Sequence, residues 1–154
     1  MVKRPEDVVR AIIEASHYMV LATADTTGHP WPSPVYFAHE GYTCFYWLSS
    51  PEAIHSRNVT TRSDVGIAIF DSTVPIGTGQ GVYLRARAAE VNDDERDPGI
   101  EVFSRRSQAH GGVAWTAADV RGDAELRLYR ALVDEHSILA KDGRPDHRNV
   151  VRLP

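Results

Sequence analysis

The residue types best suited to holding a charged ligand follow an aromatic run in the first third of the chain. Ser49 and Ser50 precede Pro51, an order typical of the start of a helix. A helix N-terminus presents unpaired backbone N–H groups and a partial positive charge, so it can bind a phosphate. His55 and Arg57, about one turn further on, could add positive charge. The segment therefore predicts either a phosphate-binding turn or an ordinary capped helix with exposed basic residues.

A second group of side chains could hold a flat ligand. Several aromatic residues fall in one predicted hairpin, where they would form either core or a wall for a planar ligand. They are Trp31, Tyr36, Phe37, Phe45, Tyr46 and Trp47. Further along, Arg85 and Arg87 share a strand face with Tyr83. That face would line a cleft or a subunit interface, or it would point to solvent.

Other kinds of chemistry are disfavoured. The 7 histidines show no H-E-x-x-H pattern, so we expect no metal site. The sequence has neither a G-x-S-x-G elbow nor a P-loop. Cys44 is the only cysteine, which excludes an internal disulfide. It alternates within an apolar strand, so we expect a buried, inert thiol.

The composition is that of one folded domain spanning residues 1–154. Charged residues make up 25% of the chain and its net charge is -4, which argues against nucleic-acid binding and against an anionic membrane surface. No apolar run approaches the roughly 18 residues of a membrane span. The N-terminus leads into an amphipathic stretch and not a signal core. With a single cysteine, we expect a cytoplasmic protein.

The elements that would position these residues are mostly strands. Helical spacing of apolar residues predicts a first helix over 5–16. We expect strands at 18–24, 31–39, 43–48, 65–71 and 82–91, and a helix from Ser50 to about Thr61. The polar segment 92–112 predicts a helix in two pieces, interrupted at Pro98-Gly99. Strands should follow at 126–133, 136–140 and 149–153. Meandering strands with few helices predict a mainly β (α+β) small barrel.

A set of segments, taken in order, carries a family resemblance. They are Gly28–Phe37, Phe45–Ser50, His55–Asn58, Gly66–Asp71 and Gln80–Ala88. Their order and spacing resemble the pyridoxamine 5′-phosphate oxidase-like family of FMN-binding split β-barrels. The resemblance implies a six-stranded antiparallel split β-barrel and a homodimer, with FMN in a groove at the subunit interface. We also expect residues 92–122 to line the side of the small-molecule substrate.

The resemblance further implies which residues hold FMN. In the family the second strand lies along the flavin ring and ribityl chain, and the end of the third strand and the helix after it bind the phosphate. A Gln before the fifth strand touches the flavin; Gln80 matches it, with Gly81 one position away. The implied cofactor-binding residues are Ser33, Pro34, Val35, Tyr36, Leu48, Ser49, Ser50, His55, Asn58 and Gln80. Hydride transfer at flavin N5 requires no acid or base side chain, so no catalytic residue is implied.

One position departs from the family pattern. Members that oxidise pyridoxamine phosphate carry Arg-Lys at the phosphate helix, where this chain has Ile54-His55. Histidine is largely neutral at pH 7, so we expect a weaker or pH-dependent grip on phosphate and no vitamin B6 oxidase activity. The sequence thus indicates an FMN-dependent oxidoreductase of unknown substrate. A deazaflavin-dependent reductase and a non-catalytic flavin- or haem-binding protein of the same fold are the alternatives.

Overall fold

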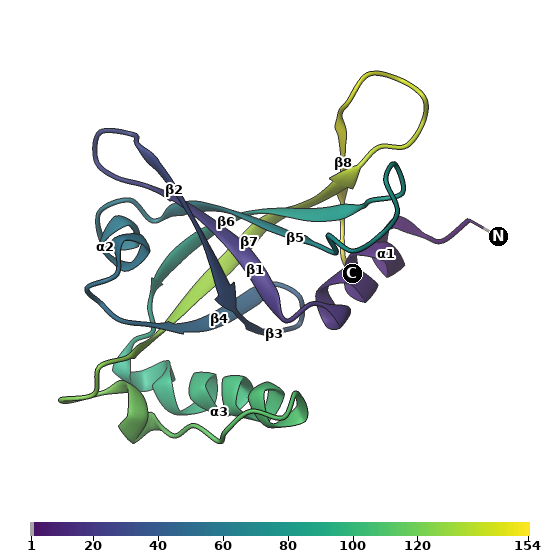
Figure 1. Cartoon of the computed structure of the whole chain (residues 1–154). Helices are drawn as coiled ribbons and strands as arrows, with labels where there is room; N and C mark the ends of the chain where they lie inside the picture. Colours follow the sequence, from purple (N-terminus) through teal and green to yellow (C-terminus); the bar gives the residue numbers. More distant parts are fainter. Residues whose placement is uncertain (1) are drawn as a thin grey trace.

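The computed structural model describes residues 2–154 as one strongly curled sheet flanked by helices (Figure 1). None of the helices in this range is long and apolar enough to cross a membrane. The elements in chain order are α1 (Pro5–Ala15), β1 (Tyr18–Ala24), β2 (Pro30–Tyr36), β3 (Ala38–Glu40), β4 (Cys44–Ser49), α2 (Ile54–Thr61), β5 (Asp64–Phe70), β6 (Gly81–Glu90), α3 (Asp93–Ala109), η1 (Ala117–Val120), β7 (Arg127–Leu139) and β8 (Arg148–Val151).

The sheet has 8 strands in the order β2-β1-β5-β6-β7-β4-β3, with β8 added beside β7. All neighbouring strands are antiparallel. The curl brings the two ends of this order toward each other, which confirms the predicted split β-barrel (Figure 1). The prediction of six strands is wrong, because β3 is a strand of its own and β8 extends the sheet near the C-terminus.

Phe37 separates β2 from β3, so the predicted single strand over 31–39 is wrong. Its side chain is fully buried, and its N–H donates to the carbonyl oxygen of His17 at 3.2 Å. Directly after it, Ala38 pairs with Tyr46 of β4 instead of continuing along β1. The chain therefore changes partners at a buried corner, and this change helps to close the curl.

The helix α2 begins at Ile54, later than the predicted start at Ser50. The carbonyl oxygen of Ser50 accepts the N–H of Ala53 at 3.1 Å, and its Oγ accepts the N–H of Glu52 at the same distance. These bonds form a turn, so Ala53 becomes the N-cap and the hydroxyl of Ser50 stabilises the turn instead of the helix.

The helix α3 runs unbroken through Pro98, so the predicted division into two pieces is wrong. Proline near the start of a helix removes only one intrahelical hydrogen bond. At Gly99 the helix approaches the sheet closely, because a Cβ there would lie 3.0 Å from Leu128 and 3.1 Å from Tyr46. The burial of Ile100 and its neighbours on this face compensates for the lost bond.

The strands predicted at 126–133 and 136–140 form one long strand, β7. Its register with β6 shifts between Arg85 and Ala86, where Asp134 is the extra residue. The Asp134 carboxylate accepts hydrogen bonds from Arg87 at 3.3 Å. Arg85 and Arg87 are both exposed and lie near acidic partners on β7, and Arg85 lines a cavity of about 240 Å³ together with Tyr83.

Apolar side chains fill the inside of the curl, and α1 covers it through the fully buried Val9 and Ile13. Three of the six aromatic residues of the hairpin belong to this interior, namely the fully buried Phe37, Phe45 and Trp47. A second, smaller cluster lies where α3 packs on β3, β4 and β7.

Arg106 of α3 joins that helix to the end of α1. Its Nη2 donates to the backbone oxygens of Ile13 at 3.1 Å, Glu14 at 3.2 Å and Ser16 at 2.8 Å. Its guanidinium also lies over the ring of Phe37, 4.6 Å from the centroid. A cation at the C-terminal end of a helix binds carbonyl groups that have no partner within the helix, so Arg106 caps α1.

Candidate functional site

A cavity of about 550 Å³ lies between the strands β2 and β4, the start of α2 and the end of α3. Its volume is within the range of small-molecule sites. The lining residues are Pro34, Val35, Tyr36, Leu48, Ser49, His55, Phe103, Ser107, Gly112, Val113, Trp115 and Leu126. The fold therefore brings the second strand, the end of the aromatic strand and the following helix to one place, as the sequence predicts.

Ser49 and His55 form the polar end of this cavity. Oγ of Ser49, the last residue of β4, lies 2.7 Å from Nε2 of His55 in the first turn of α2. Ser49 is buried and His55 is half-buried. Burial lowers the pKa of His55 below its ordinary value, so the imidazole is mainly neutral at pH 7.

The first turn of α2 adds backbone donors next to these side chains. Its N-cap, Ala53, has no side chain that could accept a hydrogen bond from the turn. The N–H groups at such an end are free to bind an anion. Arg57 contributes little to this end, because it is exposed and pairs with Glu52 at 2.6 Å. Among the described residues that line the cavity, none is Lys or Arg.

The other end of the cavity is aromatic. The ring of Phe103 lies edge-on to Tyr36, with the centroids 5.6 Å apart, and edge-on to Trp115 at 6.3 Å. These contacts give a largely apolar wall with a flat ring from each of three segments. The wall suits a planar ligand better than a charged one.

Tyr36 carries the polar atom of this aromatic end. Its hydroxyl oxygen lies 2.7 Å from Nδ1 of His110, which follows the last turn of α3. Burial raises the pKa of Tyr36, and the positive charge of Arg106 offsets part of that rise. The hydroxyl is therefore protonated at neutral pH.

Residues after position 100 supply about half of the cavity wall, and sequence reasoning did not identify them individually. Phe103 and Ser107 are four residues apart on the buried face of α3, which is the one pattern that could have indicated them. Gly112 follows the helix end, where a Cβ would lie 2.5 Å from Oγ of Ser107. A side chain there would displace the wall, so this position requires glycine. Five residues of the segment 92–122 thus line this cavity, and the expectation that the segment lines the substrate side stays a prediction.

Four of the implied cofactor residues lie outside the lining of this cavity: Ser33, Ser50, Asn58 and Gln80. Ser33 is buried in β2 and pairs in register with Leu21 of β1. Ser50 stabilises the turn before α2, as described above. Asn58 is buried, and its Nδ2 donates to Oγ1 of Thr23 at 3.0 Å. Asn58 therefore anchors α2 to β1.

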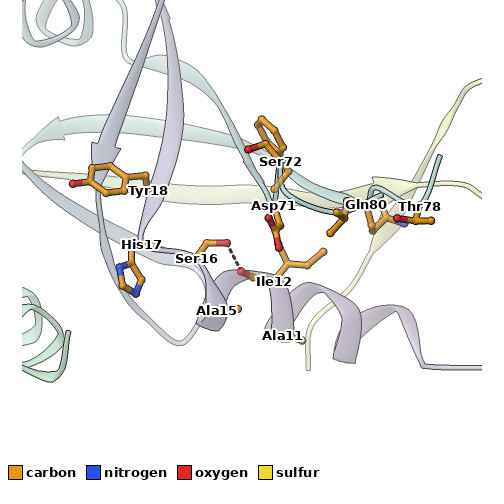
Figure 2. A pocket seen from close by; sticks show the side chains of 12 residues that line it. Ala11, Ile12, Ala15, Ser16, His17, Tyr18, Asp71, Ser72, Thr78 and Gln80 are labelled. Atoms are coloured by element: carbon orange, nitrogen blue, oxygen red, sulfur yellow. Dashed lines mark hydrogen bonds between the residues drawn. The ribbon is translucent and has the colours of Figure 1, made fainter. Parts of the chain in front are cut away.

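Gln80 lies in a different cavity, of about 560 Å³, between the end of α1 and the loop that joins β5 to β6 (Figure 2). Its Nε2 donates to the carbonyl oxygen of Leu139 at 3.1 Å, and its Oε1 accepts the N–H of the same residue at 2.9 Å. The amide thus bridges β6 and β7. Figure 2 shows His17 and Tyr18 at the opposite end of this cavity from Gln80.

The model of the pyridoxamine 5′-phosphate oxidase family matches residues 5–138. Together with the split barrel, this match shows that the chain belongs to the pyridoxamine 5′-phosphate oxidase family. No curated protein matches the chain.

Solved structures with the same fold belong to proteins that are named for different functions. A candidate 5-nitroimidazole antibiotic resistance protein from Bacteroides thetaiotaomicron is 16% identical with a TM-score of 0.72, over 90% of this chain and 85% of that one. HutZ, the haem storage protein from Vibrio cholerae, is 18% identical with a TM-score of 0.66, over 86% and 92%. An F420 reductase is 17% identical with a TM-score of 0.62, over 89% and 98%. At these identities the likeness concerns the fold.

Proposed function

We propose that this protein is an FMN-dependent oxidoreductase that binds the flavin in the cavity between β2, β4, α2 and α3. The observation that carries the proposal is the contact between Ser49 and His55 beside the uncapped start of α2. It places a hydroxyl, an imidazole and free backbone N–H groups at one end of a cavity whose other end is aromatic. This polarity matches a molecule with a phosphate at one end and a flat ring at the other.

The donors at the polar end fit a phosphate ester. When the imidazole of His55 carries its proton on Nε2, it donates to Oγ of Ser49, and the Ser49 O–H is then free to donate to a phosphate oxygen. Hydrogen bonds to a charged oxygen are stronger than neutral ones. A bound dianion would also favour protonation of His55. The flavin, when bound, supplies hydride transfer, while the residues of the chain hold and orient it.

We further propose that the protein is a cytoplasmic homodimer, with the partner closing the open side of the cavity. The outer face of β2, β1 and β5 carries small apolar residues in adjacent register. Ala22 pairs with Pro32 on one side and with Gly66 on the other, while Val20 pairs with Pro34 and Ala68. Ala22 and both prolines are exposed. Because Pro34 also lines the cavity, a second copy on this face would reach the ligand.

Haem binding is the second candidate. The imidazole of His55 is mainly neutral, and a neutral imidazole can bind haem iron. The cavity wall has no Lys or Arg, so it suits the apolar haem ring as well as it suits a phosphate ester. The fold is shared with a haem storage protein, which supports keeping this alternative.

A ligand titration tests the choice between FMN, deazaflavin and haem. The purified protein is titrated with FMN, with the deazaflavin cofactor and with haemin, and binding is followed in the visible spectrum of each ligand. We expect saturable binding of FMN at one site per subunit. Binding of haemin or of the deazaflavin in preference to FMN would overturn the proposal in favour of that alternative.

A further inference from the structure

We propose that Tyr36 is the residue that donates a proton to the substrate in the cavity, and that His110 returns the proton to Tyr36 from solvent. This inference rests on the proposed function, because it concerns a substrate bound beside a reduced flavin. It goes further in naming a proton donor and a class of substrate.

The placement of the pair carries the proposal. Tyr36 lines the cavity, whereas His110 is exposed just beyond the end of α3, and only 2.7 Å separates the hydroxyl oxygen from Nδ1. The two side chains therefore connect the cavity interior with bulk water. A phenol that gives its proton to a ligand needs a group that restores it, and His110 is the titratable group within hydrogen-bond distance of Tyr36.

Several contacts hold the pair in this geometry. The ring of His110 stacks on His17 with the centroids 4.0 Å apart, and Tyr36 lies edge-on to Tyr18 at 6.0 Å. On the inner side, Phe103 packs edge-on against Tyr36. Aromatic contacts on both sides restrict the rings to few rotamers, so the oxygen and nitrogen stay within hydrogen-bond distance.

The charged and titratable neighbours suit this role. Arg106 on α3 lies near enough to Tyr36 to favour the phenolate that remains after proton transfer. Desolvation, and then the charges of His17 and Arg106, lower the pKa of His110, so this imidazole releases a proton readily. A proton that arrives from solvent at His110 can therefore pass on to the oxygen of Tyr36.

The chemistry of the donor indicates the class of substrate. A phenol beside a hydride donor can complete the reduction of a conjugated carbonyl compound, because the enolate that hydride addition would form is basic enough to take the proton of a phenol. Reduced flavin, when bound, would supply the hydride that forms a C–H bond at the β-carbon. The O–H bond of Tyr36 then breaks, and the proton forms a C–H bond at the α-carbon of the enolate. The carbonyl compound is reduced to its saturated form, and the phenolate regains a proton from His110.

The first test needs no ligand. The histidines are titrated by NMR in the wild type and in Tyr36→Phe. We expect the pKa of His110 in Tyr36→Phe to differ from its pKa in the wild type. Tyr18→Phe is the matched control, because it removes an exposed hydroxyl from the neighbouring ring. Identical titration of His110 in wild type and Tyr36→Phe would overturn the inference, whether or not the protein binds flavin.

The second test uses the FMN-loaded protein reduced with dithionite and mixed with either 2-cyclohexenone or ferricyanide. Ferricyanide accepts electrons without a proton, so it reports the integrity of the flavin site. We expect Tyr36→Phe to slow reoxidation by 2-cyclohexenone about 10²- to 10⁴-fold more than it slows reoxidation by ferricyanide. His110→Ala should slow the enone reaction less, and added imidazole should restore it.

The outcomes separate the two proposals. Equal slowing with both oxidants, or an unchanged enone rate, would overturn the role of Tyr36. Failure of the wild-type protein to reduce the enone would overturn the substrate class. Failure to bind FMN would overturn the proposed function, and the NMR titration would still decide whether the Tyr36–His110 pair exists in solution.

Discussion

Oγ of Ser49 and Nε2 of His55 lie 2.7 Å apart across the junction of β4 and α2. Their contact holds a hydroxyl and an imidazole together at the polar end of the cavity. At position 55 the family resemblance implies a lysine, whereas this chain has a histidine, whose charge depends on pH.

Removing this pair should weaken FMN binding. The double variant Ser49→Ala, His55→Ala should raise the dissociation constant by about 10- to 1,000-fold if each lost contact contributes about 1 to 2 kcal/mol. Fluorescence titration of FMN measures the change. The double variant Ser72→Ala, His29→Ala is the control, since both residues are exposed and lie outside this cavity. Equal affinity of the two double variants would remove the site assignment.

FMN affinity should depend on pH through His55. Burial lowers its pKa in the free protein, whereas a bound phosphate would raise it, so binding takes up a proton. Affinity should therefore rise as pH falls through the pKa of the bound state. Between pH 8.5 and 6.5 we expect a gain on the order of tenfold, about 1.4 kcal/mol, which is the size of one charge-assisted hydrogen bond.

Two substitutions at the same position test that cause. His55→Lys keeps its charge across this range, so its affinity should exceed that of the wild type at pH 8.5 and change little with pH. His55→Gln stays neutral and should bind weakly at both values. A wild-type pH dependence that persists in His55→Gln would assign the effect to another group.

Ala22→Arg should abolish dimerisation and FMN binding together. It places a long charged side chain in the middle of the small apolar face of β2, β1 and β5. Ala89→Arg is the control, because Ala89 is also exposed on a strand but lies on β6 beside Arg130 of β7. Light scattering and FMN titration at equal protein concentration measure both properties. A monomeric Ala22→Arg protein that still binds FMN tightly would contradict the proposed role of the partner.

Asn58→Ala should destabilise the fold more than it affects ligand contacts. The substitution leaves buried Thr23 without its donor, which costs about 1–3 kcal/mol of unfolding free energy. Thr60→Ala, on the exposed side of the same helix, should change it by less than about 0.5 kcal/mol. Urea denaturation of both variants measures the difference, and comparable stability would show that Asn58 does not anchor α2.

The strands could be predicted from the sequence because their burial follows simple alternation. Val82 and Leu84 point inward while Arg85 and Arg87 point outward, as the period of two requires. The partner change at Phe37 could not be predicted, since it depends on the long-range pairing of Ala38 with Tyr46. The helix through Pro98 likewise follows from tertiary packing at Gly99, which outweighs local propensity.

For the site, the sequence indicated the residues whose neighbours in the chain share the cavity, such as Ser49 and His55. It did not indicate Phe103 or Trp115, because their approach to Tyr36 depends on how α3 folds back over the sheet. It also grouped Gln80 with residues that lie in a different cavity of the same protomer.

The guanidinium of Arg106 links α1 to a cavity that this helix does not line. The same helix that holds the last carbonyl oxygens of α1 presents Phe103 and Ser107 to the ligand. Local unfolding of α1 would remove the backbone acceptors of Arg106, so the end of α3 that carries Ser107 would lose one of its supports. Proteolytic removal of the chain ahead of Tyr18 could in this way weaken ligand binding without altering any group that lines the cavity.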